Sequence, residues 1–125
     1  MARALGIGGV FFRSPDPAAL SAWYREHLGF KLEENGCSAF KPDQLPGGGY
    51  TVWSPFKVDT TYFAPSRKSF MVNLIVDDLD GALAQVKDAG ATLVGEPTDD
   101  PEFGRFGWFM DPEGNKVELW QPPAP

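Results

Sequence analysis

Apolar residues recur at helical spacing in two segments of the chain, residues 18–28 and 79–89. This spacing predicts two amphipathic helices, each with one face toward a core. An aspartate that can cap the helix precedes each segment, and a glycine that can end it follows. The residues that form the apolar faces are Leu20, Trp23, Tyr24 and Leu28 in the first helix and Leu79, Leu83 and Val86 in the second.

Runs of β-forming residues predict strands around both helices. The runs cover residues 7–13, 30–34, 37–41 and 50–54 in the first half, and 70–76, 91–94, 105–110 and 116–121 in the second. Asn35-Gly36 is a strong two-residue hairpin signal, and the Asp-Pro-Glu-Gly sequence at residues 111–114 predicts another turn. Each half therefore follows the order strand, helix, three strands, and residues 95–104 are expected to form a polar loop.

The two halves repeat this order at a nearly constant interval. The capping residues Asp16 and Asp78 are separated by almost the same number of positions as the helix-ending glycines Gly29 and Gly90. We interpret the repeat as an α+β fold of two βαβββ modules within a single domain, residues 1–125. The first module covers residues 5–55, a connector covers 56–68, the second module covers 69–122, and a tail covers 123–125.

Composition and charge narrow the classes of partner. The 125 residues are 42% apolar and 22% charged, a mixture typical of a globular domain. The formal net charge of −6 argues against nucleic acids and anionic membranes, because both attract positive surfaces. No apolar run approaches the roughly 20 residues that span a bilayer, and the N-terminus does not resemble a signal peptide. The single cysteine, Cys37, excludes an internal disulfide and is expected to be a packed thiol, so we expect a cytoplasmic protein.

Two motifs resemble those of one protein superfamily. The first is Asp16-Pro17 followed by Trp-Tyr-Arg-Glu-His-Leu-Gly-Phe at residues 23–30. The second is Val-Asp-Asp-Leu at residues 76–79 followed by Phe-Met-Asp-Pro-Glu-Gly-Asn-Lys-Val-Glu-Leu at residues 109–119. Over residues 5–122 the chain resembles the glyoxalase/bleomycin resistance/extradiol dioxygenase superfamily, also called vicinal oxygen chelate proteins. The resemblance implies that the modules form a curled mixed-sheet cup with helices on its convex face, and that the protein is a homodimer.

Alternation along the strands predicts which side chains point into this cup. In residues 116–121, Val117 and Leu119 face the helices, whereas Lys116, Glu118 and Trp120 face the cup. By the same parity, Trp108 is expected on the neighbouring strand opposite Glu118. The residues expected to line a ligand site are Phe11, Arg13, Thr51, Trp53, Met71, Asn73, Trp108, Glu118 and Trp120.

The resemblance also implies positions for a divalent metal, because enzymes of this superfamily hold one through His, Glu or Gln side chains. The matching positions here are Gly9, Thr51, Met71 and Glu118, and only Glu118 keeps a ligand of that type. One carboxylate does not hold a catalytic ion, which needs about three protein ligands. His27, the only histidine, is expected at the end of the first helix, where a positive charge is favourable. We therefore expect no metal and no other cofactor.

The sequence leaves two interpretations of Glu118 open. In an aromatic cup it could act as a general base or as the counter-charge of a cationic ligand. It could instead form a structural ion pair with Arg13, Arg105 or Lys116. The tryptophans would supply flat apolar walls that suit planar or cationic molecules, although aromatic residues also fill cores.

These observations favour a metal-free protein that binds a small aromatic or cationic organic molecule in an acidic, aromatic cup. No nucleic acid or membrane is expected as a partner. The alternative is a glyoxalase-like lyase or isomerase that uses Glu118 as general base or metal ligand. A third hypothesis is a scaffold that binds another protein and no small ligand.

Overall fold

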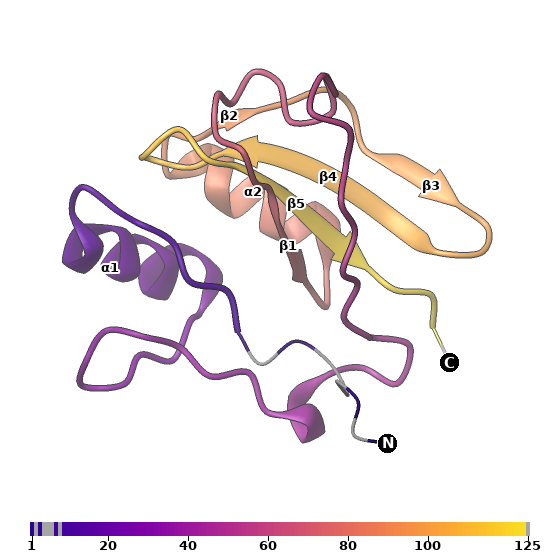
Figure 1. Ribbon diagram of the computed structural model, residues 1–125, viewed down its shortest axis with the longest axis horizontal. Helices are drawn as coiled ribbons and strands as arrows, with labels where there is room; N and C mark the ends of the chain where they lie inside the picture. The colour runs from indigo at the N-terminus through magenta and orange to yellow at the C-terminus, as the bar shows by residue number, and fades with distance from the viewer. Residues whose placement is uncertain (2, 4–6, 8, 125) are drawn as a thin grey trace.

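The structure, a computed structural model, describes residues 1, 3, 7 and 9–124 and has the predicted α+β architecture (Figure 1). Residues 2, 4–6, 8 and 125, which include the start of the predicted first module and the end of the tail, lie outside the described residues. In chain order the elements are α1 (Pro17–Leu28), the 3-10 helix η1 (Pro42–Gln44), β1 (Val72–Ile75), α2 (Leu79–Asp88), β2 (Thr92–Leu93), β3 (Thr98–Asp100), β4 (Gly104–Met110) and β5 (Lys116–Gln121). Among the described residues, no helix is long and apolar enough to cross a membrane.

The second half of the chain forms an open mixed sheet. Its strand order is β1-β5-β4-β2, and β3 also pairs with β4. β1 runs parallel to β5, while β2, β3 and β5 run antiparallel to β4. Trp108 on β4 lies opposite Glu118 on β5, so the predicted register of the last hairpin is confirmed. On the other side of β5, Asn73 of β1 also lies opposite Glu118.

One face of the sheet packs against α2 and forms the core. Side-chain alternation sends Val117 and Leu119 of β5 to this face, as predicted, and both are buried. A Cβ atom placed on Gly107 of β4 would lie 2.8 Å from a methyl group of Leu83, so the helix approaches β4 too closely for a larger residue. The buried residues of this core are Leu20, Tyr24, Leu79, Ala82, Leu83, Val86, Phe109, Val117 and Leu119.

Both helices begin where the sequence predicts because an aspartate caps each of them. Asp16 accepts a hydrogen bond from the backbone N–H of Ala19 at 3.1 Å, and Asp78 accepts one from Gly81 at 3.1 Å. These bonds satisfy N–H groups that have no partner within the helix. Gly29 ends α1 in the left-handed conformation, with φ of 69°, which glycine adopts without a steric cost.

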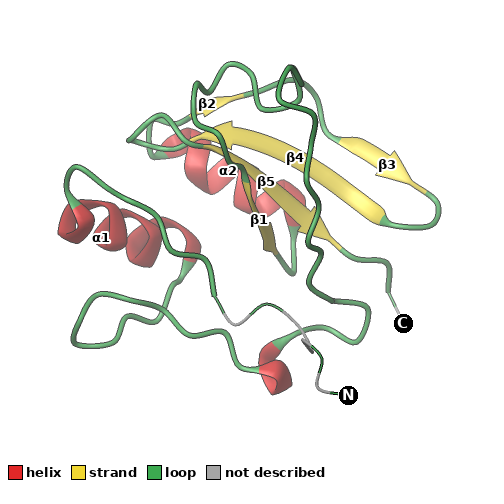
Figure 2. Cartoon of the chain, in the orientation of Figure 1, coloured by secondary structure: helices red, strands yellow, loops and turns green. Residues whose placement is uncertain are grey.

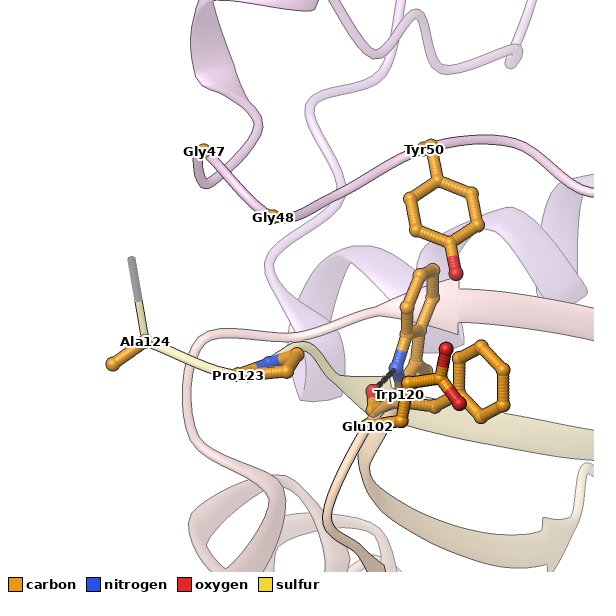
Figure 3. A pocket seen from close by; sticks show the side chains of 8 residues that line it. Gly47, Gly48, Tyr50, Glu102, Trp120, Pro123 and Ala124 are labelled. Atoms are coloured by element: carbon orange, nitrogen blue, oxygen red, sulfur yellow. Dashed lines mark hydrogen bonds between the residues drawn. The ribbon is translucent and has the colours of Figure 1, made fainter.

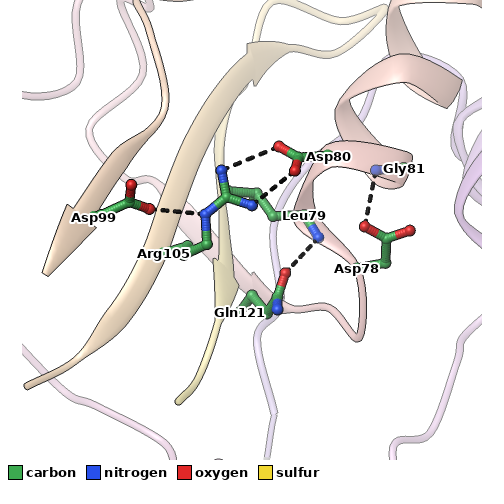
Figure 4. Close-up of polar contacts among 7 residues, drawn as sticks. All are labelled: Asp78, Leu79, Asp80, Gly81, Asp99, Arg105 and Gln121. Carbon is green, nitrogen blue, oxygen red and sulfur yellow. Dashed lines mark hydrogen bonds and ion pairs between the residues drawn. The ribbon is translucent and has the colours of Figure 1, made fainter. Parts of the chain in front are cut away.

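The start of α2 is tied to the sheet by polar contacts (Figure 4). The backbone N–H of Leu79 donates to Oε1 of Gln121 on β5 at 2.8 Å. Arg105 on β4 donates to both carboxylate oxygens of Asp80 at 2.9 and 3.1 Å, and to Asp99 on β3 at 2.7 Å. The guanidinium therefore connects a helix and two strands.

The turn between β4 and β5 attaches α1 to the second module. The hydroxyl of Tyr24 donates a buried hydrogen bond to Oδ2 of Asp111 at 3.0 Å, and the side-chain amide of Asn115 donates to the same oxygen at 2.8 Å. Glu113 accepts a bond from the hydroxyl of Ser14 at 2.9 Å and another from the backbone N–H at the helix N-cap. The Asp-Pro-Glu-Gly-Asn motif is thus both a turn and the junction between the two halves.

The first half differs from its prediction. The turn at Asn35-Gly36 forms, but its flanks pair only through a single bridge between Leu32 and Ser38. Residues 9–13 and 50–54 contain no strand and are drawn as loop in Figure 2. β propensity reflects packing on a half-buried surface, and these segments have no such surface here.

Two smaller predictions of the sequence analysis are also wrong. The predicted polar loop at residues 95–104 contains β3, because Asp99 faces Arg105 across the ladder and the ion pair favours pairing there. Cys37 is exposed rather than packed, since it flanks a turn that lies at the surface.

We predict that Tyr24→Phe lowers the free energy of unfolding by about 1.5–3 kcal/mol, because Asp111 loses a buried, charge-assisted hydrogen bond while packing is kept. Urea denaturation measures the change. Tyr50→Phe, at an exposed tyrosine, serves as the control and should stay close to the unmodified protein. Equal stability of the two variants would contradict the proposed role of the turn.

Candidate functional site

The face of the sheet opposite α2 carries a polar cluster centred on Glu118. Glu118 on β5 lies between Asn73 on β1 and Trp108 on β4, so three neighbouring strands place the side chains in one row. Oε1 of Glu118 accepts a hydrogen bond from the amide of Asn73 at 2.7 Å. Oε2 accepts one from the indole Nε1–H of Trp108 at 2.8 Å. The strand register thus generates a buried carboxylate with two fixed donors.

A third donor comes from the connector, which crosses in front of the sheet in Figure 1. The hydroxyl of Tyr62 donates to Oε2 of Glu118 at 2.5 Å. Lys116 donates from Nζ to the backbone carbonyl of Tyr62 at 2.6 Å, and its ammonium lies 5.2 Å from the centroid of the Tyr62 ring. Tyr62 was not among the predicted site residues, although the three aromatic residues Phe56, Tyr62 and Phe63 in the connector were a usable signal.

Burial and charge shape the ionisation of this cluster. Glu118 and Lys116 are only 8% and 7% exposed. Burial raises the pKa of Tyr62 above its ordinary value, and the hydrogen bond and negative charge of Glu118 raise it further. Burial lowers the pKa of Lys116, and the nearby Glu118 carboxylate partly opposes that shift. The hydroxyl of Tyr62 therefore keeps its proton and donates a hydrogen bond to Glu118.

The cluster does not fit a divalent metal. The carboxylate of Glu118 is surrounded by the O–H and N–H donors of Tyr62, Asn73 and Trp108, whereas a metal needs side chains that offer lone pairs. Lys116 adds a cation to the same face. Over the described part of the chain, His, Cys, Asp and Glu form no group of three or more that could hold a metal ion.

An open cavity of about 240 Å³ lies on the same face, next to Trp120 (Figure 3). The ring of Tyr50 meets the Trp120 indole edge-on, with centroids 5.0 Å apart, and Phe106 stacks on the indole at 6.2 Å. The indole is held in place because its Nε1–H donates to the carbonyl of Phe103 at 2.6 Å. The cavity is lined by Gly47, Gly48, Tyr50, Glu102, Phe103, Trp120, Pro123 and Ala124.

A second cavity, of about 370 Å³, lies on the helical side of the molecule, where Trp23 meets the turn after α2. The carboxylate in its wall, Asp111, already accepts bonds from Tyr24, from Asn115 and from two backbone N–H groups. The second cavity therefore offers a ligand little polar recognition. In the cavity beside Trp120, by contrast, the Glu102 carboxylate is exposed.

The structure brings some of the predicted site residues together and leaves others apart. Asn73, Trp108 and Glu118 form one hydrogen-bonded cluster, and Trp120 lies two residues further along β5 on the same face. Phe11 and Trp53 are 96% and 79% exposed. Arg13 and Thr51 are also exposed, and Met71 is half-buried. Among the described residues, none of these five is hydrogen-bonded to Glu118, and their roles in binding stay predictions.

Comparison with known proteins gives a family match over most of the chain. The family model described as a glyoxalase-like domain matches residues 9–120. The mycobacterial protein CFP32, from Mycobacterium bovis and Mycobacterium tuberculosis, is 37% identical over 51 residues, which are 41% of this chain. The matched part of this chain spans 20% of the length of CFP32.

Two solved structures are similar in fold. TioX from Micromonospora sp. ML1 is 21% identical with a TM-score of 0.51, over 90% of this chain and 92% of TioX. TnmS3, an antibiotic binding protein from Streptomyces sp. CB03234, is 23% identical with a TM-score of 0.49, over 83% of this chain and 84% of TnmS3. The likeness to TioX supports the overall α+β fold.

The raised pKa of Tyr62 predicts a loss of stability in alkali. In the unfolded chain a tyrosine ionises near its ordinary pKa of 10.0, whereas the folded state retains the proton to higher pH. The contribution of Tyr62 is therefore fully present below pH 10 and is lost as the pH rises above it. Tyr24 acts with the same sign, because burial and Asp111 raise its pKa.

Tyr62→Phe should consequently reduce the fall in unfolding free energy above pH 10, as measured by urea denaturation at a series of pH values. Lys116 has a lowered pKa and opposes the trend below its ordinary value of 10.5, but it is common to both proteins. Identical slopes for the variant and the unmodified protein would show that the hydroxyl of Tyr62 does not contact Glu118 in solution.

Because the donors around Glu118 do not fit a metal, we predict that EDTA leaves the melting temperature of the purified protein unchanged. Differential scanning fluorimetry before and after dialysis measures it. A fall of several degrees that one divalent ion restores would contradict the prediction.

Proposed function

Because the chain belongs to the family of glyoxalase-like domains, we propose that it binds a small aromatic or cationic organic molecule on the open face of its sheet, without a catalytic metal. The observation that carries this proposal is the cavity beside Trp120, which combines fixed aromatic walls with an exposed carboxylate. Ligand sites in proteins are concave, mostly apolar, and contain a few well-placed polar groups.

The chemistry of the cavity sets the class of ligand. The rings of Tyr50 and Trp120 offer faces and edges for stacking, and the carboxylate of Glu102 offers a negative charge. Stacking and cation–π contacts contribute about 0.5–2 kcal/mol each. No positive side chain is among the lining residues, and the whole chain has a net charge of −6. A planar ligand with a positive charge satisfies both features.

Glu118 does not supply the counter-charge in this proposal, although that role was one of the two interpretations that the sequence left open. Glu118 is buried, and its oxygens accept three hydrogen bonds, so neighbouring donors in the protein already stabilise its charge. Glu102 is the carboxylate that a cation can reach from solvent. Glu118 instead accepts the hydrogen bond of the Trp108 indole and holds that ring in place.

The alternative function is a glyoxalase-like lyase or isomerase with Glu118 as general base or metal ligand. The similarity to CFP32, whose name suggests a glyoxylase, favours this alternative over one segment of the chain. A base must have a lone pair free to take a proton from the substrate. In this chain Tyr62 and Trp108 both donate to Oε2, whereas Oε1 accepts only from Asn73 and keeps one lone pair. Because Glu118 is only 8% exposed, a substrate has little access to that lone pair while Tyr62 stays in place.

A homodimer and a cytoplasmic location complete the proposal. The exposed rings of Phe11 and Trp53 leave apolar surface that a second copy could cover. The single cysteine is free, which suits a reducing compartment.

We predict that benzylammonium, a cationic aromatic probe, shifts the Trp120 indole N–H signal in NMR spectra and that benzyl alcohol binds more weakly. Tyr50→Ala should weaken both probes by about ten-fold, because one wall of the cavity is lost. Glu102→Gln should weaken only benzylammonium, by about two- to five-fold, the effect of an exposed ion pair.

Glu34→Gln is the matched control, since it removes an equal charge from an exposed residue that does not line the cavity. If Glu102→Gln and Glu34→Gln have the same effect on benzylammonium, the carboxylate is not a counter-charge. If neither probe shifts Trp120, the cavity is not a ligand site.

A further inference from the structure

Tyr62 is bound to the sheet in the way that a small phenolic ligand would be bound. Its hydroxyl donates to a buried carboxylate, Glu118, at 2.5 Å. Its ring lies edge-on to Trp108, with centroids 6.3 Å apart and an interplanar angle of 88°. The ammonium of Lys116 lies over the same ring. The three contacts recognise an O–H donor, a ring edge and a ring face, which together define a phenol.

The segment that carries Tyr62 is weakly attached elsewhere. Its backbone hydrogen bonds are local turns, such as Thr60 N–H to Lys57 and Ala64 N–H to Thr61. Among the described residues, its hydrogen bonds to the sheet are the hydroxyl of Tyr62 to Glu118 and the ammonium of Lys116 to the Tyr62 carbonyl. Tyr62 itself is 41% exposed. The side chain can therefore leave without opening the core against α2.

We propose that Glu118, Asn73, Trp108 and Lys116 form a phenol-binding subsite that Tyr62 occupies in the free protein, and that a phenolic ligand replaces Tyr62 there. This inference rests on the proposed function, because it names a ligand class for the same face of the sheet. The hydroxyl of the ligand donates to Glu118, and its ring takes the place between Trp108 and Lys116.

Competition within the chain gives the proposal a measurable consequence. Tyr62 is tethered next to its subsite, so it competes with a free phenol at a high effective concentration. Removing the tyrosine ring should increase the affinity of the subsite for a phenol, whereas neutralising the acceptor, Glu118, should decrease it. Loss of a purely structural contact would not produce this opposite pair of effects.

The experiment uses p-cresol, which is the tyrosine side chain as a free molecule, and 4-methylanisole, which has the same ring without the O–H donor. Each is titrated into the full chain labelled at its tryptophan indoles, and Trp108→Phe assigns the Trp108 signal. We expect p-cresol to shift the Trp108 signal and 4-methylanisole to leave it in place. Tyr62→Ala should bind p-cresol at least about ten-fold more tightly than the unmodified protein.

Three further variants make the result decisive. Tyr62→Phe keeps the ring and loses the bond to Glu118, so it should bind p-cresol more tightly than the unmodified protein even if Tyr62→Ala does not fold. Glu118→Gln keeps one neutral acceptor oxygen and loses the charge, so it should weaken p-cresol binding by about ten-fold. Val58→Ala, at a fully exposed position of the same segment, is the matched control and should leave p-cresol affinity unchanged.

Two results would overturn the inference. In the first, p-cresol binds the Tyr62 variants but does not bind the unmodified protein even at a concentration that saturates the variants. A free phenol then does not displace Tyr62, and Tyr62 is a fixed part of the fold. In the second, 4-methylanisole binds as tightly as p-cresol, which would mean that the subsite recognises only the apolar ring and not the O–H donor. Benzylammonium reports separately at Trp120, so failure at Trp108 alone rejects the phenol subsite and leaves the proposed function standing.

Discussion

The alternation of side chains along β5 divides the molecule into a packed face and a polar face. Val117 and Leu119 are buried against α2, which requires Glu118 and Trp120 to point to the other side. A slip of one residue in the register would exchange the two sets and place a carboxylate in the core. The apolar core therefore fixes where the polar cluster and the cavity lie, and the candidate site follows from the same pattern that stabilises the fold.

Burial of Glu118 is tolerated because its surroundings offset the cost. A carboxylate taken out of water loses several kcal/mol unless it is paired and hydrogen-bonded. Here Tyr62, Asn73 and Trp108 donate to it, and Lys116 places a positive charge nearby. Three of these groups come from the sheet and are fixed by its register. Tyr62 comes from a loop, so the register of the sheet does not fix it.

Local signals predicted the parts of this molecule that depend on local physics. The two helices follow from apolar spacing and from the caps Asp16 and Asp78, and the pairing of Trp108 with Glu118 follows from counting along one hairpin. Tyr62 could not be placed in the same way, because a loop has no period from which its partner can be counted. The strands predicted at residues 7–13 and 50–54 do not form over the described residues 9–13 and 50–54 for a related reason, since β propensity has no effect without a partner surface.

The two proposals concern adjacent places on one surface. Trp120 and Glu118 are two residues apart on β5, which separates them by about 7 Å along the strand. The cavity beside Trp120, at about 240 Å³, is smaller than most ligand pockets, which measure roughly 300–1,000 Å³. Departure of Tyr62 would extend the open surface from Trp120 toward Trp108 and Glu118. A ligand that spans both places would then stabilise the open position of the connector, and opening of the connector would raise affinity for that ligand by the same factor.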